Sequence, residues 1–203
     1  MTIQKRLPQK KALQNRGNIM IEWITQLDFS ILYWIQNALK CAFLDIIMPK
    51  ITSLGNAGFL WLLSAGILIL IPKYRRTGIL LLTGLAIGML IGNIVMKPLF
   101  ARSRPCWLDT AVELLILVPK DYSFPSGHTL SSVIAATILT AADRRFAFVA
   151  IPLATVIAFS RLYLFVHFPT DILTSIILGL VIGITVWKCG SVVLNRFFPT
   201  RRR

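Results

Sequence analysis

Long apolar runs alternate with short polar segments along this chain. The apolar runs cover approximately residues 29–48, 57–71, 78–96, 128–142, 146–164 and 172–187. Runs of about 15 to 22 residues with almost no charge are what helices need to cross a hydrocarbon core about 30 Å thick. The pattern therefore predicts an all-α, polytopic membrane helix bundle with six transmembrane helices. The first run is the weakest of them because it contains Lys40 and Asp45.

The connection between the third and fourth runs carries a shorter apolar piece. This piece, "TAVELLILVP" at 110–119, has too few residues to cross a bilayer. We expect it to lie in the membrane interface.

Charge separates two classes of protein that composition alone leaves open. The chain is 56% hydrophobic and carries a formal net charge of +14, which is typical of a nucleic-acid binder or of a membrane protein with basic cytoplasmic segments. A nucleic-acid binder would interleave its basic residues with the apolar runs. Here most of them lie between the runs, so we expect a lipid bilayer as partner and no nucleic acid.

The positions of Lys and Arg predict how the bundle is oriented. Basic charge is concentrated in four segments, namely residues 1–20, "KYRR" at 73–76, "DRR" at 143–145 and residues 191–203. With six spans all four fall on one side, which the positive-inside rule assigns to the cytoplasm. We therefore expect a basic cytoplasmic tail at each end (1–20 and 191–203) and a six-span domain over 21–190.

The cysteines and the start of the chain add little to this picture. Cys41, Cys106 and Cys189 have no paired spacing and no neighbouring histidine, so neither a disulfide framework nor a zinc site is expected. The basic start has no small-residue cleavage site behind a clean apolar core, which is not the pattern of a cleavable signal peptide.

The predicted topology brings four helix ends to the outward face. They carry Lys97 after the third run, His128 at the start of the fourth, Arg161 at the end of the fifth and Asp171 at the start of the sixth. Positive and titratable groups at span ends, against the charge bias, usually serve a function. The topology alone therefore predicts one polar site at this face.

The residue types at this face suit a phosphate group. Lys97, Arg104 and Arg161 are cations with few carboxylates nearby, and the planar arginine fork matches phosphate geometry. In "PSGH" (125–128), Ser126 is a good N-cap, and Gly127 allows close backbone approach to an anion at the helix N-terminus. Loop-to-helix segments of this kind are common, however, so the segment alone does not indicate a site.

The segment "HFPTD" predicts a nucleophile. Pro169 is suited to a first helical turn, so Asp171 lies about one turn beyond His167 and can bond one imidazole nitrogen. The other nitrogen is then free to attack, although an isolated His–Asp pair more often caps a helix. A second histidine on the same face, His128, can act as the acid for the leaving oxygen. Together they make a phosphomonoester hydrolase without a metal.

These residues fall into three motifs that resemble those of the type 2 phosphatidic acid phosphatase (PAP2, lipid phosphate phosphatase) superfamily. The family patterns are K-x6-R-P, P-S-G-H and S-R-x5-H-x3-D. They stand in this chain, complete and in the same order, as "KPLFARSRP" (97–105), "PSGH" (125–128) and "SRLYLFVHFPTD" (160–171). The resemblance implies a helical core like that of the vanadium haloperoxidases, whose soluble members are far less apolar than this chain.

The resemblance also implies roles for the site residues. His167 would be the nucleophile that forms a phosphohistidine, Asp171 would orient it, and His128 would serve as general acid and then as general base. The phosphate would be held by Lys97, Arg104, Ser126, Gly127 and Arg161. No metal and no other cofactor would take part. Outside the motifs, we expect Arg102 to face lipid headgroups or solvent, and Tyr122 and Phe124 to line the route by which lipid reaches the site.

The motifs bind phosphate and do not define the lipid. Small bacterial members of the family hydrolyse phosphatidylglycerophosphate or undecaprenyl diphosphate; the first is our main expectation, with the second as alternative and phosphatidic acid as a further substrate. Such an enzyme would lie in the bacterial plasma membrane with its site on the extracytoplasmic side. Two other classes remain open, a serine hydrolase using Ser126 and a transporter or structural bundle with a polar path. Nothing in the sequence predicts an oligomeric state.

Overall fold

A computed structural model describes the backbone of residues 6–197 and the side chains of residues 21–194. Within these ranges the chain is helical and contains no β-strand. The elements in chain order are α1 (Arg6–Leu39), α2 (Ala42–Leu54), the 3₁₀ turn η1 (Asn56–Gly58), α3 (Phe59–Leu70), α4 (Arg75–Gly88), the π-helix η2 (Met89–Met96), α5 (Lys97–Phe100), α6 (Pro105–Leu108), α7 (Gly127–Ala142), the 3₁₀ turn η3 (Arg144–Phe146), α8 (Ala147–Tyr163) and α9 (Pro169–Phe197).

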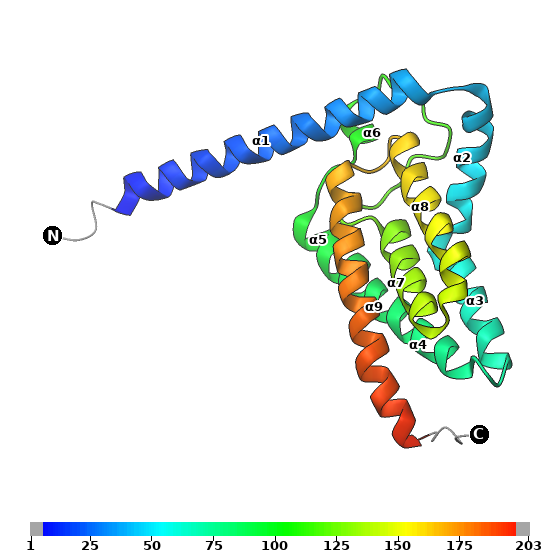
Figure 1. Ribbon diagram of the computed structural model, residues 1–203. Coiled ribbons are helices and arrows are strands. Elements are labelled where there is room, and N and C mark those ends of the chain that lie inside the picture. Colours follow the sequence, from blue (N-terminus) through cyan, green and yellow to red (C-terminus); the bar gives the residue numbers. More distant parts are fainter. Residues whose placement is uncertain (1–5, 198–203) are drawn as a thin grey trace.

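The helices from α2 onward run side by side as a bundle, and α1 lies across one end of it (Figure 1). We call this the site end. Helix α7 is the central element and packs against α4, α8 and α9. Its neighbours approach closely where they carry glycine: a Cβ at Gly88 would stand 2.5 Å from Ile134 of α7, and one at Gly179 would stand 2.8 Å from Val133. Small residues allow this spacing between membrane helices.

The first predicted span, residues 29–48, is not one helix. Helix α1 ends at Leu39, Cys41 has extended backbone angles, and α2 begins at Ala42 and turns along the bundle (Figure 1). The charges that weaken this run mark the turn: the Tyr163 hydroxyl donates to Asp45 over 2.6 Å and accepts from the Cys41 N–H over 3.4 Å. The aspartate is therefore satisfied at a helix boundary rather than inside a span.

The second predicted span corresponds to α3, which is joined to α2 as a bent pair with an angle of 45°. The bend falls at Ala57 and Gly58, whose φ angles are 50° and 67°. Glycine adopts this left-handed conformation without steric cost. Residues 42–70 thus form one broken apolar segment.

Among the described residues, three stretches are long and apolar enough to cross a membrane, and the bent α2–α3 pair would be a fourth. These stretches are Arg75–Leu108, Arg144–Tyr163 and Pro169–Leu194, and they correspond to the third, fifth and sixth predicted spans. The fourth predicted span is α7, which is apolar but only 16 residues long. The chain is therefore a helical membrane protein, and the predicted count of six spans is not confirmed.

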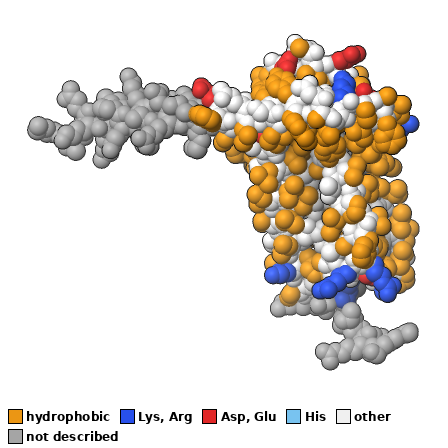
Figure 2. All heavy atoms as spheres, turned by 45° about the horizontal axis from the view of Figure 1, so that its top comes forward, with side chains coloured by type: hydrophobic (Ala, Val, Ile, Leu, Met, Phe, Trp, Pro, Cys, Tyr) orange, Lys and Arg blue, Asp and Glu red, His pale blue; other side chains and the backbone are white. Residues whose placement is uncertain are grey.

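The outer surface of the bundle matches a membrane environment. Hydrophobic side chains cover its sides, while Lys and Arg gather at the end away from α1 (Figure 2). The residues exposed at that end include Lys73, Arg75, Arg144 and Arg145. The predicted N-terminal tail (1–20) overlaps α1, and residues 1–5 and the side chains of 6–20 lie outside the described residues. The predicted C-terminal tail overlaps the end of α9, and its residues 198–203 are likewise outside them.

The connection 109–126 covers the site end. Its apolar piece 110–119 forms no helix. It is fastened by the Trp107 indole N–H, which donates to the Pro119 carbonyl over 3.1 Å, and by Tyr33 of α1, whose hydroxyl donates to Asp109 over 2.7 Å. The connection therefore forms a cover held by both α1 and α6.

The π-helix η2 continues α4 toward the site end and leads directly into α5. Lys97, the first residue of α5, is buried. π-helical turns are rare and occur frequently at functional sites. Here the π-helix ends where the first sequence motif begins.

Candidate active site

The three sequence motifs meet in one cavity of about 1030 Å³ at the site end. Its polar wall comes from every predicted site segment: Lys97, Arg104, Gly127, His128, Arg161 and His167. The remainder of the wall is largely apolar and is supplied by α3, α4, η2 and α7: Leu62, Leu82, Leu85, Ala86, Met89 and Leu130. Leu62 of α3 and Met89 of η2 are themselves exposed, so the apolar wall is accessible at these two helices.

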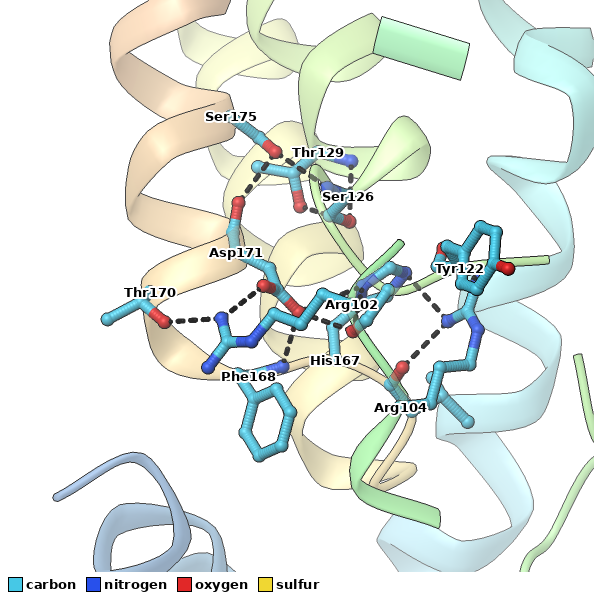
Figure 3. A network of polar contacts seen from close by, with 12 residues as sticks. Arg102, Arg104, Tyr122, Ser126, Thr129, His167, Phe168, Thr170, Asp171 and Ser175 are labelled. Atoms are coloured by element: carbon cyan, nitrogen blue, oxygen red, sulfur yellow. Dashed lines mark hydrogen bonds and ion pairs between the residues drawn. The ribbon is translucent and has the colours of Figure 1, made fainter. Parts of the chain in front are cut away.

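His167 lies in the short loop between α8 and α9 and is 1% exposed. Its Nδ1 is 3.5 Å from Asp171 Oδ2 and its Nε2 is 3.0 Å from Arg104 Nη1 (Figure 3). Since Arg104 can only donate, these contacts assign the proton to Nδ1 and the lone pair to Nε2. The nitrogen with the lone pair is the one next to Arg104, which lines the cavity.

The surroundings of His167 favour its neutral form. Burial lowers the pKa of His167 well below the ordinary value of 6.5, and the positive charges of Arg104, Arg161 and Lys97 lower it further. Removal from water penalises the charged imidazolium, and nearby cations add to the penalty. His167 therefore keeps a lone pair at neutral pH.

Asp171 is held by several donors at the start of α9 (Figure 3). Its Oδ2 accepts the Phe168 N–H over 2.9 Å and the Ser123 hydroxyl, and its Oδ1 accepts from Arg102 over 2.5 Å. The carboxylate also lies in the first turn of α9, where the helix dipole stabilises negative charge. Pro169 opens that turn, as the sequence predicts. Asp171 is thus fixed beside Nδ1 of His167.

The prediction for Arg102 is wrong. Its guanidinium does not face headgroups but links two buried carboxylates: Nη1 donates to Asp171, and Nη2 donates to Asp28 of α1 over 2.7 Å. It also lies over the Phe168 ring, 4.1 Å from the ring centroid. Asp28 further accepts the Thr170 N–H over 3.0 Å. The sequence gives one signal for Asp28, an acidic residue directly before the first apolar run.

Arg104 is held mainly by main-chain oxygens. Its Nη1 donates to the Val166 carbonyl and its Nε to the Asp121 carbonyl, both over 2.7 Å. Its Nη2 donates to the Asp121 carboxylate over 2.8 Å, and Lys97 also pairs with this carboxylate. Burial by itself raises the pKa of Asp121, but the bond to Lys97 and the charge of Arg104 outweigh it and bring the value to about 2. Sequence reasoning missed Asp121, which belongs to no motif.

Arg161 approaches the cavity from the end of α8. It is 4% exposed, and its Nη1 donates to the Thr52 hydroxyl of α2 over 2.6 Å. Its Nε has no hydrogen-bond partner, and no carboxylate of the described residues forms an ion pair with it. A buried guanidinium without a counterion indicates a place for an anion.

His128 stands at the start of α7 and packs against the bend between α2 and α3. Its Nε2 is 3.0 Å from Asn56 Oδ1, and a Cβ added at Gly55 would lie 2.6 Å from its Cδ2 atom. Thr52, Gly55 and Asn56 were missed from the sequence. The signal that could have found them is the polar turn "TSLGN" at 52–56, which separates two apolar runs.

The predicted phosphate contact of Ser126 stays a prediction. Ser126 is fully buried and does not line the cavity. Its Oγ caps α7 by accepting from the Thr129 N–H, and its own N–H donates to Ser175 over 2.8 Å (Figure 3). Gly127, the next residue, does line the cavity. Tyr122 and Phe124 do not, and Phe124 packs on Phe100 instead.

Among the described residues, no group of three or more His, Cys, Asp or Glu side chains is arranged to hold a metal ion. Cys41 and Cys189 are exposed, Cys106 is buried, and all three are free.

Comparison with known proteins adds independent findings. Residues 77–193 match the PAP2 superfamily. An undecaprenyl-diphosphatase of Sulfolobus acidocaldarius is 30% identical over 149 residues, which are 73% of this chain and 71% of the relative. Two crystal structures are similar: Aquifex aeolicus LpxE (TM-score 0.71, 26% identity, 80% of this chain and 95% of the other) and a transmembrane PAP2-type phosphatidylglycerolphosphate phosphatase of Bacillus subtilis (TM-score 0.70, 25% identity, 89% of each chain).

Proposed function

The chain belongs to the PAP2 superfamily, and on this premise we propose that it hydrolyses membrane-lipid phosphates through His167, with phosphatidylglycerophosphate as its main substrate. The observation that carries the proposal is the two-part wall of the cavity. One end gathers two histidines and three cations with Asp121, and much of the rest is apolar and accessible at α3 and η2. A lipid phosphate has the same division, an anionic group joined to apolar chains.

The first half of the reaction is transfer of phosphate to His167. Nε2 attacks phosphorus, the bond between phosphorus and the lipid oxygen breaks, and His128 gives its proton to that oxygen. Attack leaves a positive charge on the imidazole, which Asp171 stabilises from the Nδ1 side. Lys97, Arg104 and Arg161 offset the charge on the phosphate oxygens in the transition state.

The second half is hydrolysis of the phosphohistidine. His128, now neutral, takes a proton from water, the water oxygen attacks phosphorus, and the N–P bond breaks. Inorganic phosphate leaves and Nε2 regains its lone pair. Every proton in this cycle is carried by a histidine of the chain, so the proposal needs no metal.

The substrate preference rests on similarity and on fit. The Bacillus subtilis phosphatidylglycerolphosphate phosphatase resembles this chain over 89% of both proteins. The undecaprenyl-diphosphatase of Sulfolobus acidocaldarius supports undecaprenyl diphosphate as a second candidate. The cavity wall suits both, because each substrate joins phosphate to a long apolar group. Phosphatidic acid is a third candidate on the same chemistry.

We place the site end on the extracytoplasmic side of a bacterial plasma membrane. The exposed basic residues of the loops at 73–76 and 143–145 lie at the opposite end (Figure 2). Short basic loops favour the cytoplasm, and α9 runs toward that same end. The predicted cytoplasmic N-terminus is not supported, since α1 lies across the site end (Figure 1).

Two other functions fit the site less well. A serine hydrolase would need an accessible Ser126, whose hydroxyl instead caps α7. A transporter would need polar residues along a path through the bundle, whereas these gather at one end of the cavity.

The test is phosphate release by purified protein in detergent with excess chelator. We expect release from phosphatidylglycerophosphate, and a panel with undecaprenyl diphosphate and phosphatidic acid ranks the substrates. His167→Ala should lose nearly all activity, while Glu113→Gln, an exposed change outside the cavity, should retain it. Activity retained by His167→Ala would disprove the nucleophile. Loss of activity with chelator, restored by a divalent ion, would disprove the metal-free mechanism.

A further inference from the structure

Asp121 is the one acidic residue among the described residues that line the cavity. It lies on the connection 109–126 that covers the site end, and its side chain is 56% exposed. The other carboxylates near the site, Asp28 and Asp171, are buried outside the cavity wall. Asp121 is therefore a carboxylate that both faces the cavity and can leave it.

The carboxylate of Asp121 forms ion pairs with two of the three cations. Oδ1 accepts from Arg104 over 2.8 Å, and Oδ2 pairs with Lys97. A carboxylate presents two oxygens to these donors in the manner of two phosphate oxygens. The carboxylate thus takes up the donors that a bound phosphate would need.

The third cation is not neutralised by Asp121. Arg161 has no ion-pair partner among the described carboxylates, and its Nε has no hydrogen bond. Lys97, Arg104 and Arg161 carry three positive charges, and Asp121 carries one negative charge, so these four side chains sum to +2. When the carboxylate is displaced, all three cations face the phosphate group, which carries about −1.5 to −2 at neutral pH.

The position of Arg104 does not depend on the Asp121 side chain. Its guanidinium is fixed by the main-chain carbonyls of Val166 and of Asp121 itself. Movement of the Asp121 carboxylate would therefore leave Arg104 in place beside His167. The pKa of Asp121, about 2, also keeps the carboxylate charged at neutral pH.

We propose that Asp121 is a displaceable counterion of the phosphate site. A phosphate group binds by replacing its carboxylate on Lys97 and Arg104, and the carboxylate returns as inorganic phosphate leaves. The carboxylate thereby weakens phosphate binding and aids product release. The inference rests on the proposed function of the same site.

The experiment compares binding of inorganic phosphate to the purified full chain in detergent, by titration calorimetry, between the native protein and Asp121→Asn. The variant keeps the main-chain contacts of Arg104 and removes one negative charge next to two cations. We expect the dissociation constant for phosphate to fall about tenfold, because a unit charge at contact distance changes the attraction strongly in a partly buried site. Product inhibition by phosphate should strengthen by the same factor. Glu113→Gln, on the same connection but outside the cavity, should bind like the native protein.

Unchanged or weaker phosphate binding by both Asp121→Asn and Asp121→Ala would overturn the inference, because the carboxylate would then be holding Lys97 and Arg104 for the substrate. Lipid phosphate hydrolysis by the native protein is measured in the same preparations. Hydrolysis with no tighter binding in the variants rejects the counterion role alone. Absence of both hydrolysis and phosphate binding in every form rejects the proposed function itself.

Discussion

Replacement of Arg102 by methionine tests the link between α1 and Asp171, the aspartate beside His167. Arg102 is the ion-pair partner of both Asp28 and Asp171, which are 1% and 0% exposed. Arg102→Met keeps much of the apolar side chain that lies over Phe168. It leaves two buried carboxylates without their shared cation. We therefore expect both stability and activity to fall.

The magnitude follows from the burial of the two carboxylates. Removing one partner of a buried ion pair costs about 3–5 kcal/mol. The Arg102 side chain is 23% exposed, so solvent screens part of this charge and we expect the lower end, about 3 kcal/mol. For a chain of this length, about 2–4 °C of melting temperature corresponds to each kcal/mol. The midpoint should fall on the order of 10 °C.

A double-mutant cycle separates the ion pair from general damage. In the native protein, Asp28→Asn weakens the bond to Arg102 and should cost about 1–2 kcal/mol. In Arg102→Met, the same change removes an uncompensated buried carboxylate and should be neutral or stabilising. The coupling between the two positions should be about 1–3 kcal/mol.

The assay is thermal unfolding of each variant in one detergent at one scan rate, with phosphate release measured on the same samples. Arg144→Met, an exposed arginine at the opposite end, is the matched control and should be neutral. If Asp28→Asn lowered the midpoint equally with and without Arg102, the two side chains would not be coupled and the reasoning would be refuted.

Four further predictions follow from named contacts. The chain has two histidines, so the ring-¹⁵N spectra of the variant His128→Gln report on His167 alone. The His167 ring should remain neutral at pH 6.5, and a titration midpoint near 6.5 would contradict the effect of burial on its pKa. Since folding lowers the pKa of His167, its contribution to stability is present above pH 6.5 and is lost as the pH falls below that value. Melting curves of the native protein and of His167→Ala, recorded over this pH range, measure the difference. Gly55→Ala should displace the His128 ring and lower kcat up to about a hundredfold, while the melting temperature stays nearly unchanged. A fall in melting temperature together with the fall in kcat would instead indicate misfolding. Gly88→Ala should lower stability by about 1–3 kcal/mol through overpacking against Ile134, while kcat per folded molecule is retained. An unchanged melting temperature would argue against this close helix contact.

The residues that the sequence predicts best are those within motifs. Lys97, His128 and Arg161 lie at the ends of apolar helices, and helices of bilayer length bring their ends together whatever their exact packing. That geometry is why motif residues far apart in sequence line one cavity.

The partners of these residues were harder to predict. Asp28 and Thr52 come from α1 and α2, where the apolar pattern was interpreted as one span over 29–48. Lys40 and Asp45 make that run the weakest predicted span, and in the structure they mark a turn, because a tyrosine more than a hundred residues away satisfies Asp45. Asp121 could be found only from its contacts, since a lone carboxylate in a loop has no local signature.

The π-helix between α4 and α5 sets the rotational phase of everything that follows it. Each residue of an α-helix advances the direction of its side chain by about 100°. Residues of a π-helix advance by less, because each turn holds more of them. Deleting one residue within Met89–Met96 would convert the wide turns toward ordinary helical ones and change the direction of Lys97 relative to the cavity it lines. Even a shortening that spares the cavity-lining residues Met89 and Asn93, and barely changes the hydrophobic length of the segment, would thus misdirect a cation. Residues 89–96 therefore serve the chemistry by setting the direction in which Lys97 points.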